Sequence, residues 1–136
     1  MSAIGGDIIE VTCNHPTLGD FTFYPKGSED STYDLGGFRS ADEANGVDGS
    51  GAMIDQMNRV RWFFEIVYAW EQSTTDDLAN MKSLGADPVA GTWTFTHING
   101  SVYSGDGKPV GDIQGNGNAG TFSAKVSGGA DLEKIV

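Results

Sequence analysis

The stretch MIDQMNRVRWFFEIVYAW, from Met53 to Trp70, decides the fold class of this chain. Large apolar residues occupy every second position from Val60 to Trp70, whereas the positions between them mix charged with apolar side chains. A period of two over this length predicts one long β-strand, bent or bulged, with one face in the core. The core face would hold Val60, Trp62, Phe64, Ile66, Tyr68 and Trp70, and the other face Asp55, Met57, Arg59, Arg61, Phe63, Glu65 and Val67.

This second, mixed face has two interpretations. It is either a solvated sheet face, on which Arg59 and Glu65 find neighbouring charges, or a subunit contact or channel lining. Apolar side chains interleaved with charge are unusual on a free surface, which favours the second interpretation. The candidate residues for a lumen or interface strand face are Asp55, Met57, Arg59 and Arg61.

Further strands are expected on both sides of this stretch. Residues 7–13 and the run around Phe21 and Phe23 should pair as a hairpin. Residues 92–98 alternate, with Trp93 and Phe95 on one side, and Asn99-Gly100 predicts a two-residue hairpin turn. Shorter strands are expected at 101–104, 108–114, 121–126 and 132–136, with turns at 106–107, 115–120 and 128–129.

One helix is expected, over about residues 74–85. Ser73, Thr74 and Thr75 are N-cap candidates, and Gly85 suits the position after the last helical residue. An apolar stripe of Leu78, Met81 and Leu84 predicts packing on a sheet. The chain of 136 residues is therefore predicted to form one mainly β domain, 1–136, with one flanking α-helix.

Between the second predicted strand and the long one lies a segment, residues 26–51, that is rich in glycine and acidic residues. A structureless β–β loop of this length is uncommon in a compact domain and is usually functional or disordered. Tyr33, Leu35 and Phe38 are apolar anchors within it that need a surface to rest on. That surface is either the domain itself or another subunit.

The chain is strongly acidic, with a net charge of −11 from nineteen acidic and eight basic residues. Such a protein does not hold a nucleic-acid backbone by counterion release. The charge serves either solubility or a surface that lies near DNA without binding it. The first residues do not resemble a secretory signal, and no apolar run is long enough for a membrane helix, so we expect a soluble protein made in a cytoplasm.

Few residues suggest site chemistry. The lone Cys13 excludes an intrachain disulfide and is expected to be buried. His97 is expected to be hydrogen-bonded within a sheet, and His15, beside Pro16, to be exposed. The glycines of 115–120 match a dinucleotide-binding pattern by letters, but a strand rather than a helix follows, so a hairpin turn explains them. We expect no catalytic, cofactor-binding or metal-binding residue and no enzyme activity.

Several stretches carry a family resemblance. They are Tyr24-Pro25, EDSTYDLGGFRS (29–40), MIDQMNRVRW (53–62), Trp93-Thr94, HINGSV (97–102), GKPVGD (107–112), QGNGNAGTF (114–122), Gly128-Gly129 and Leu132. Together they resemble the tail tube proteins of contractile-tailed bacteriophages, over nearly the whole chain.

The resemblance implies a small β-sandwich or partial barrel in which six copies form a ring and their strands join into a continuous inner β-barrel. Rings would stack helically inside a contractile sheath, with long loops contacting the neighbouring ring; Tyr33, Leu35, Phe38 and Arg39 are the candidate contacts. Six copies at −11 each carry −66 per ring, so phosphates would slide past the wall. If Arg59 and Arg61 faced the lumen, they would need acidic partners such as Asp55 or Glu65.

The partners implied are further copies of the chain, the tail sheath protein, baseplate and tail terminator proteins, and double-stranded DNA that passes without specific binding. The protein would lie in the virion, in the phage tail assembled in the host bacterial cytoplasm, with no membrane insertion by this chain. Two other functions remain: another self-assembling tail or baseplate subunit, and a carbohydrate-binding β-sandwich. The latter would use tryptophans as a stacking platform, although the alternation should bury at least two of Trp62, Trp70 and Trp93.

Overall fold

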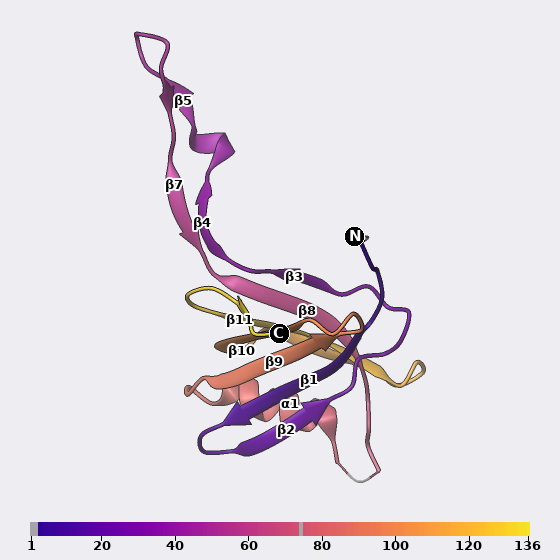
Figure 1. Ribbon diagram of the computed structural model, residues 1–136. Coiled ribbons are helices and arrows are strands. Elements are labelled where there is room, and N and C mark those ends of the chain that lie inside the picture. Colours follow the sequence, from indigo (N-terminus) through magenta and orange to yellow (C-terminus); the bar gives the residue numbers. More distant parts are fainter. Residues whose placement is uncertain (1–2, 74) are drawn as a thin grey trace.

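A computed structural model describes residues 3–73 and 75–136. Within these residues, the body consists of one antiparallel sheet of eight strands and one helix, and a long arm projects from it (Figure 1). The body elements are β1 (Ile8–His15), β2 (Gly19–Phe23), β3 (Thr32–Asp34), β8 (Trp62–Ala69), α1 (Asp77–Ala86), β9 (Gly91–His97), β10 (Val102–Asn116), β11 (Thr121–Gly128) and β12 (Glu133–Lys134). The arm contains β4 (Gly37–Ser40), the 3-10 turn η1 (Asp42–Ala44), β5 (Gly46–Val47), β6 (Met53–Ile54) and β7 (Met57–Val60).

The sheet runs in the order β2-β1-β9-β10-β11-β8-β3, and β12 pairs with β10 beside this path. Strand β10 is shared between two layers: residues 102–107 pair with β9 and residues 108–116 with β11. The chain leaving β2 also reaches the far layer, because Pro25 bridges Tyr68 and Lys26 N donates to Val67 O at 3.0 Å. The predicted mainly β fold is confirmed, and this folded-over sheet fits a partial barrel or sandwich.

The core lies between the two layers. The ring of Phe64, on β8, is 5.0 Å from that of Phe95 and 6.1 Å from that of Trp93, both on β9. Phe23 packs against Tyr68 at 5.9 Å. The alternation predicted the buried positions Trp62, Phe64, Ile66, Tyr68, Trp93 and Phe95 correctly, whereas Val60 and Trp70, expected on the same core face, are only partly buried. Cys13 is buried, as expected, and Phe122, Ala124 and Val126 of β11 complete this part of the core.

The helix and its packing are confirmed, but its ends differ from the prediction. Asp76 is the N-cap, accepting a hydrogen bond from Ala79 N at 3.2 Å, so neither Ser73 nor Thr75 caps it; Thr74 lies outside the described residues. Gly85 is helical rather than following the helix, which ends at Ala86. Met81 and Leu84 are buried against the sheet, as expected from the stripe.

Four further expectations are wrong in whole or in part. The stretch 53–70 is three strands rather than one, since only β8 belongs to the body. Residues 106–107 are not a turn but lie within β10, and Asn99-Gly100 belongs to a three-residue loop closed by the bond from His97 N to Ser101 O at 2.8 Å. The segment 26–51 is not structureless: it contributes β3 to the body and one side of the arm.

Candidate assembly surface

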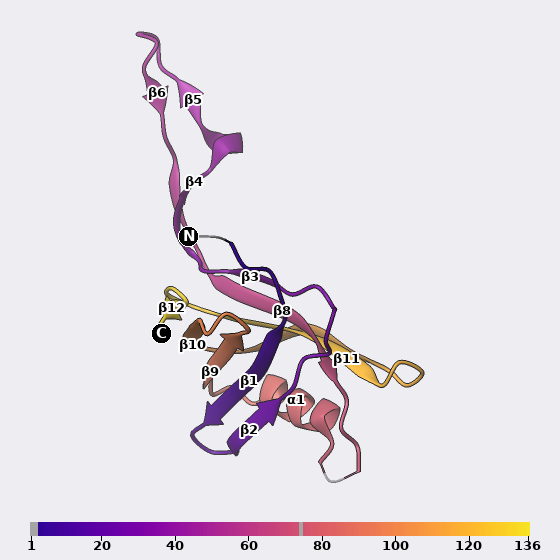
Figure 2. The ribbon, with the colours of Figure 1, turned by 45° about the vertical axis from the view of Figure 1, so that its right-hand side comes forward.

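The arm, residues 37–60, is a β-hairpin that stands away from the body (Figures 1 and 2). Near its base, Phe38 pairs with Arg59 and Ser40 with Met57; near its tip, Val47 pairs with Met53. Among the strands of residues 3–73 and 75–136, β4 and β7 pair only with each other, and so do β5 and β6. The arm therefore gains no support from the sheet beyond its base.

The tip turn is shaped by a carboxylate. Asp48 Oδ1 accepts hydrogen bonds from Ser50 N at 2.8 Å and from Ala52 N at 3.1 Å, and Asp48 N donates to Ala52 O at 2.9 Å. The hydrogen bond from the Ser50 hydroxyl, followed by those from Ser50 N and Ala52 N, lowers the pKa of Asp48 because these bonds favour its charged form. The Asp48–Gly51 stretch thus closes a hairpin.

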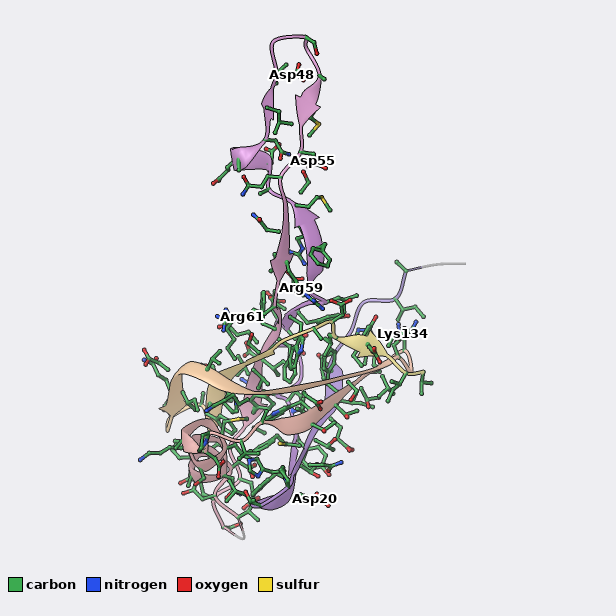
Figure 3. The ribbon with its side chains drawn as sticks, turned by 90° about the vertical axis from the view of Figure 1, so that its left-hand side faces the viewer. Asp20, Asp48, Asp55, Arg59, Arg61 and Lys134 are labelled. Atoms are coloured by element: carbon green, nitrogen blue, oxygen red, sulfur yellow. The ribbon has the colours of Figure 1, made fainter. Side chains whose placement is uncertain are left out.

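One face of the arm gathers four of the eight predicted contact residues. Because opposed residues on paired strands point to the same side, Phe38, Met57 and Arg59 share a face. The Arg59 guanidinium lies over the Phe38 ring, 5.3 Å from its centroid. Asp55 joins them through the Ser40 hydroxyl, which donates to its carboxylate. Figure 3 shows Asp55 and Arg59 along the arm, and we name Phe38, Asp55, Met57 and Arg59 the contact face.

The arm exposes much apolar surface. Phe38 is 66% exposed, and Val47, Met53, Ile54 and Met57 are each more than half exposed. The chain has 8110 Å² of accessible surface, whereas a compact monomer of 14.4 kDa has about 6,800 Å². The excess of about 1,300 Å² exceeds the ~800 Å² that each partner contributes to a standard protein interface. A two-stranded hairpin is at best marginally stable alone, so this surface suits a partner.

Two of the predicted contact residues lie on the body instead. Tyr33, on β3, packs against the rings of Phe95 at 5.1 Å and Tyr103 at 5.6 Å. Burial is the main cause that raises the pKa of Tyr33. Leu35 is 45% exposed, and its carbonyl accepts a hydrogen bond from Leu132 N at 2.9 Å. Tyr33 thus rests on its own domain, whereas Phe38 does not.

Arg39, the fourth predicted contact, forms an ion pair with Asp34 at the base of the arm. Gly36 N also donates to Asp34 Oδ1, at 2.9 Å. The Arg39 hydrogen bond, followed by that from Gly36, holds the pKa of Asp34 below its usual range. Arg39 is therefore engaged within its own chain.

The remaining basic residues of the predicted strand face lack acidic partners. Within the described ranges, the guanidinium groups of Arg59 and Arg61 have no carboxylate oxygen within 4.0 Å. Both side chains are exposed, and Figure 3 shows them where the arm meets the body. Their charges are thus available to a carboxylate of another molecule.

The body adds open strand edges. β2 and β3 stand at the two ends of the sheet order, and residues 108–116 of β10 pair with a strand on one side, β11. Exposed edges offer unpaired N–H and C=O groups to another chain. The arm and these edges together form the candidate assembly surface.

Ligand chemistry is sparse in the described part of the chain. No group of three or more His, Cys, Asp or Glu residues there is arranged to hold a metal ion. His15 is buried, contrary to expectation: its Nδ1 accepts from Leu18 N at 3.1 Å and its Nε2 donates to Val89 O at 2.9 Å. His97 Nδ1 accepts from Asn99 N at 3.2 Å, as expected of a hydrogen-bonded sheet histidine. No helix in residues 3–73 and 75–136 is long and apolar enough to cross a membrane.

The comparisons with known proteins add no relative. The chain matches no protein-family model, and no curated protein matches it. We therefore infer the function from the geometry of the chain and from its sequence pattern.

Sequence reasoning missed the apolar tip of the arm. Val47 and Met53 are a cross-strand pair that flanks the turn of residues 48–52. One apolar residue on each side of an Asp-Gly-Ser-Gly turn is the sequence pattern that could have predicted this hairpin. The signal is weak, because each strand there has only two residues.

Proposed function

We propose that this protein is a structural subunit that assembles with identical copies into stacked hexameric rings, forming the inner tail tube of a contractile-tailed bacteriophage. The phage genome would be ejected through the lumen of this tube. The observation that carries the proposal is the arm, whose contact face and apolar tip are exposed and find no supporting surface among residues 3–73 and 75–136. In a stack of rings, the arm reaches the neighbouring ring and buries this face there.

The open sheet supports ring formation. Strand addition between identical sheets satisfies the backbone groups along an edge, and a head-to-tail contact that closes produces a ring. The edges of β2, β3 and the second half of β10 are the strands that a neighbouring copy would extend. Backbone hydrogen bonds continuing between subunits would make the tube rigid, which suits a passive conduit.

The charge of the chain supports a role beside DNA. A wall with an excess of carboxylates repels phosphates, and screening confines this repulsion to about 8 Å at physiological salt. Arg59 and Arg61 have no acidic partner among the described residues, so on a lumen wall they would bind phosphates. We therefore assign Arg59 to the contact with another subunit, where carboxylates are abundant, rather than to the lumen.

The tube would contact the tail sheath along its outside and the baseplate and tail terminator proteins at its ends, within the virion. Another self-assembling tail or baseplate subunit would also use an arm of this kind. A carbohydrate-binding role receives less support, because Trp62 and Trp93 are buried and Trp70 donates its N–H to Asp76 at 3.1 Å. These three rings form no shared platform for a sugar.

Negative-stain electron microscopy of the concentrated full-length protein tests the proposal. Hollow rings and tubes of stacked rings are the expected particles. Closed rings that never stack would favour a baseplate component. A protein that stays monomeric in light scattering at the highest soluble concentration, with and without added tail proteins, contradicts the proposal.

A further inference from the structure

The direction of the arm is set at a small junction where it leaves the body. Three segments meet there: the chain entering the arm at Gly36, the chain leaving it between Val60 and Trp62, and the C-terminal segment. The arm is about 40 Å long, at ~3.3 Å per residue of extended chain. A tilt of about 15° at its base would move its tip by about 10 Å, which is the distance between packed sheets. A useful arm therefore needs a rigid base.

Gly36 fits tightly into this junction. Its φ of +76° is a conformation that residues with a side chain rarely adopt. A Cβ atom at Gly36 would lie 2.8 Å from Trp62 N and 2.9 Å from Val60 O, both closer than real Cβ contacts. The strand entering the arm thus lies directly against the backbone of the strand that leaves it.

The C-terminal segment, residues 129–136, connects this junction to the body. On the arm side, Asp131 forms an antiparallel bridge with Gly36, and Leu132 N donates to Leu35 O at 2.9 Å. On the body side, β12 pairs with β10, and Ile135 N donates to Val102 O at 2.8 Å. Figure 2 shows β12 close to the place where the arm leaves the body.

A buried side chain anchors the segment between these two attachments. Leu132 is 3% exposed and belongs to the hydrophobic core. Fully burying a leucine side chain contributes roughly 1.5–3 kcal/mol. The backbone contacts to Gly36 and Leu35 are therefore held in place by the core rather than by the arm.

We propose that residues 129–136 act as a clasp that fixes the direction of the arm and so determines where it meets a second copy of this chain. The inference rests on the proposed function for its consequence in assembly, but the orientation of the arm is a property of the monomer. Without the clasp, the arm would pivot about the chain between Val60 and Trp62. Its contact face would then reach a neighbouring subunit in many directions instead of one.

The turn that enters the clasp offers a matched pair of variants. Ala130 is exposed and has a φ of +57°. Proline holds φ near −65°, so Ala130→Pro cannot form this turn and directs residues 131–132 away from Gly36. Glycine adopts the observed φ without strain, so Ala130→Gly preserves the clasp. Neither substitution removes a core side chain.

Spin labels at Ser50, on the arm tip, and at Asn99, on the body, report the arm direction by electron–electron distance measurement. Both sites are exposed, and the labelled proteins carry Cys13→Ala to remove the native thiol. The wild type and Ala130→Gly should give one narrow distance distribution, and Ala130→Pro a distribution at least about twice as wide. Fluorescence of the buried Trp62 and Trp93 verifies that each variant is folded. A narrow, unchanged distribution for folded Ala130→Pro overturns the clasp.

Hydrogen exchange of the wild-type protein tests the clasp without any variant. The amide of Leu132 should exchange at least roughly a hundredfold more slowly than that of Gly51 at the arm tip, because core-anchored bonds open far less often than those of a hairpin turn. Equal rates for the two amides overturn the clasp.

The two proposals fail in different experiments. A wild type with a fixed arm that forms no rings or tubes refutes the proposed function and leaves the clasp intact. Tubes formed equally by Ala130→Pro and the wild type, with unchanged arm distances, refute the clasp and leave the tube. If both hold, Ala130→Pro remains folded and loses tube formation, whereas Ala130→Gly retains it.

Discussion

Removing the Phe38 side chain from the arm tests directly whether the contact face is buried on assembly. Phe38 is 66% exposed in the monomer and lies next to Arg59 on the contact face. A phenylalanine buries about 200 Å², so about 130 Å² remains to be covered by a neighbouring subunit. At ~25 cal/mol per Å², this burial contributes about 3 kcal/mol to each intersubunit contact.

Phe38→Ala should therefore weaken each contact by roughly a hundredfold or more, since ~1.4 kcal/mol corresponds to a factor of ten. The body should keep its stability, because β4 and β7 pair only with each other among the described strands. The critical concentration for polymerisation, measured as the protein left in solution after pelleting, should rise by that factor at fixed salt. Thermal unfolding of the body, followed by fluorescence of the buried tryptophans, should be unchanged.

Phe38→Leu provides the matched control, because leucine retains most of the apolar area. Its critical concentration should stay within about tenfold of the wild-type value, as expected for swaps between large apolar residues. If Phe38→Ala polymerised at the wild-type critical concentration, the exposed ring would contribute nothing to the contact, and burial of Phe38 by a neighbouring subunit would be refuted. An equal defect in both variants would show that shape at this position, rather than buried area, controls assembly.

Three other residues give predictions about the single chain. Since Arg39 lowers the pKa of Asp34, their interaction stabilises the base of the arm at pH values above about 3.9, the usual pKa of an aspartate. This stabilisation is lost as the pH falls through the lowered pKa. Arg39→Ala should raise the pKa of Asp34 in an NMR titration, and an unchanged pKa would contradict the pairing. Burial raises the pKa of Cys13 to about 12, so at pH 8 an aromatic disulfide reagent should modify Cys13 only as fast as the protein unfolds. Immediate stoichiometric labelling would contradict the burial of Cys13. The buried Tyr68 hydroxyl has no hydrogen-bond partner among the described residues. Tyr68→Phe should therefore raise the free energy of unfolding, measured in guanidinium, by about 1 kcal/mol. A decrease in the free energy of unfolding by a similar amount would show that the hydroxyl has a partner.

The body of the protein could be predicted because its strands are half buried. Where one face of a strand packs in a core and the other does not, the sequence alternates, and the register follows. Trp62 to Tyr68 and Thr92 to His97 illustrate this, and their core positions agree with the prediction. The helix was equally visible from its apolar stripe.

The arm could not be predicted as a hairpin for the complementary reason. Its strands have two to four residues each, and apart from Gly37 at the base none of their residues is buried, so no alternation marks them. Their pairing joins residues about twenty apart across a segment rich in glycine and acidic residues. The apolar anchors were visible, but only the structure separates Tyr33, on the body, from Phe38, on the arm.

The turn predicted at residues 106–107 shows a different limit. Asp-Gly commonly marks a hairpin turn, but here Gly107 lies where β10 crosses another backbone. A Cβ atom at Gly107 would lie 2.4 Å from Ser127 O. The glycine permits close packing of two strands rather than a reversal of the chain, and this distinction depends on contacts between residues far apart in the sequence.

A high-resolution electron cryomicroscopy reconstruction of the particle that the full-length protein forms would test the tube assembly directly. We expect a hollow tube in which β2, β3 or the second half of β10 pairs with a strand of a neighbouring copy. The contact face of each arm, including Phe38 and Arg59, should be covered by a subunit of the adjacent ring. A particle without a central passage, or one in which every arm stays exposed and every sheet ends within its own chain, would contradict it.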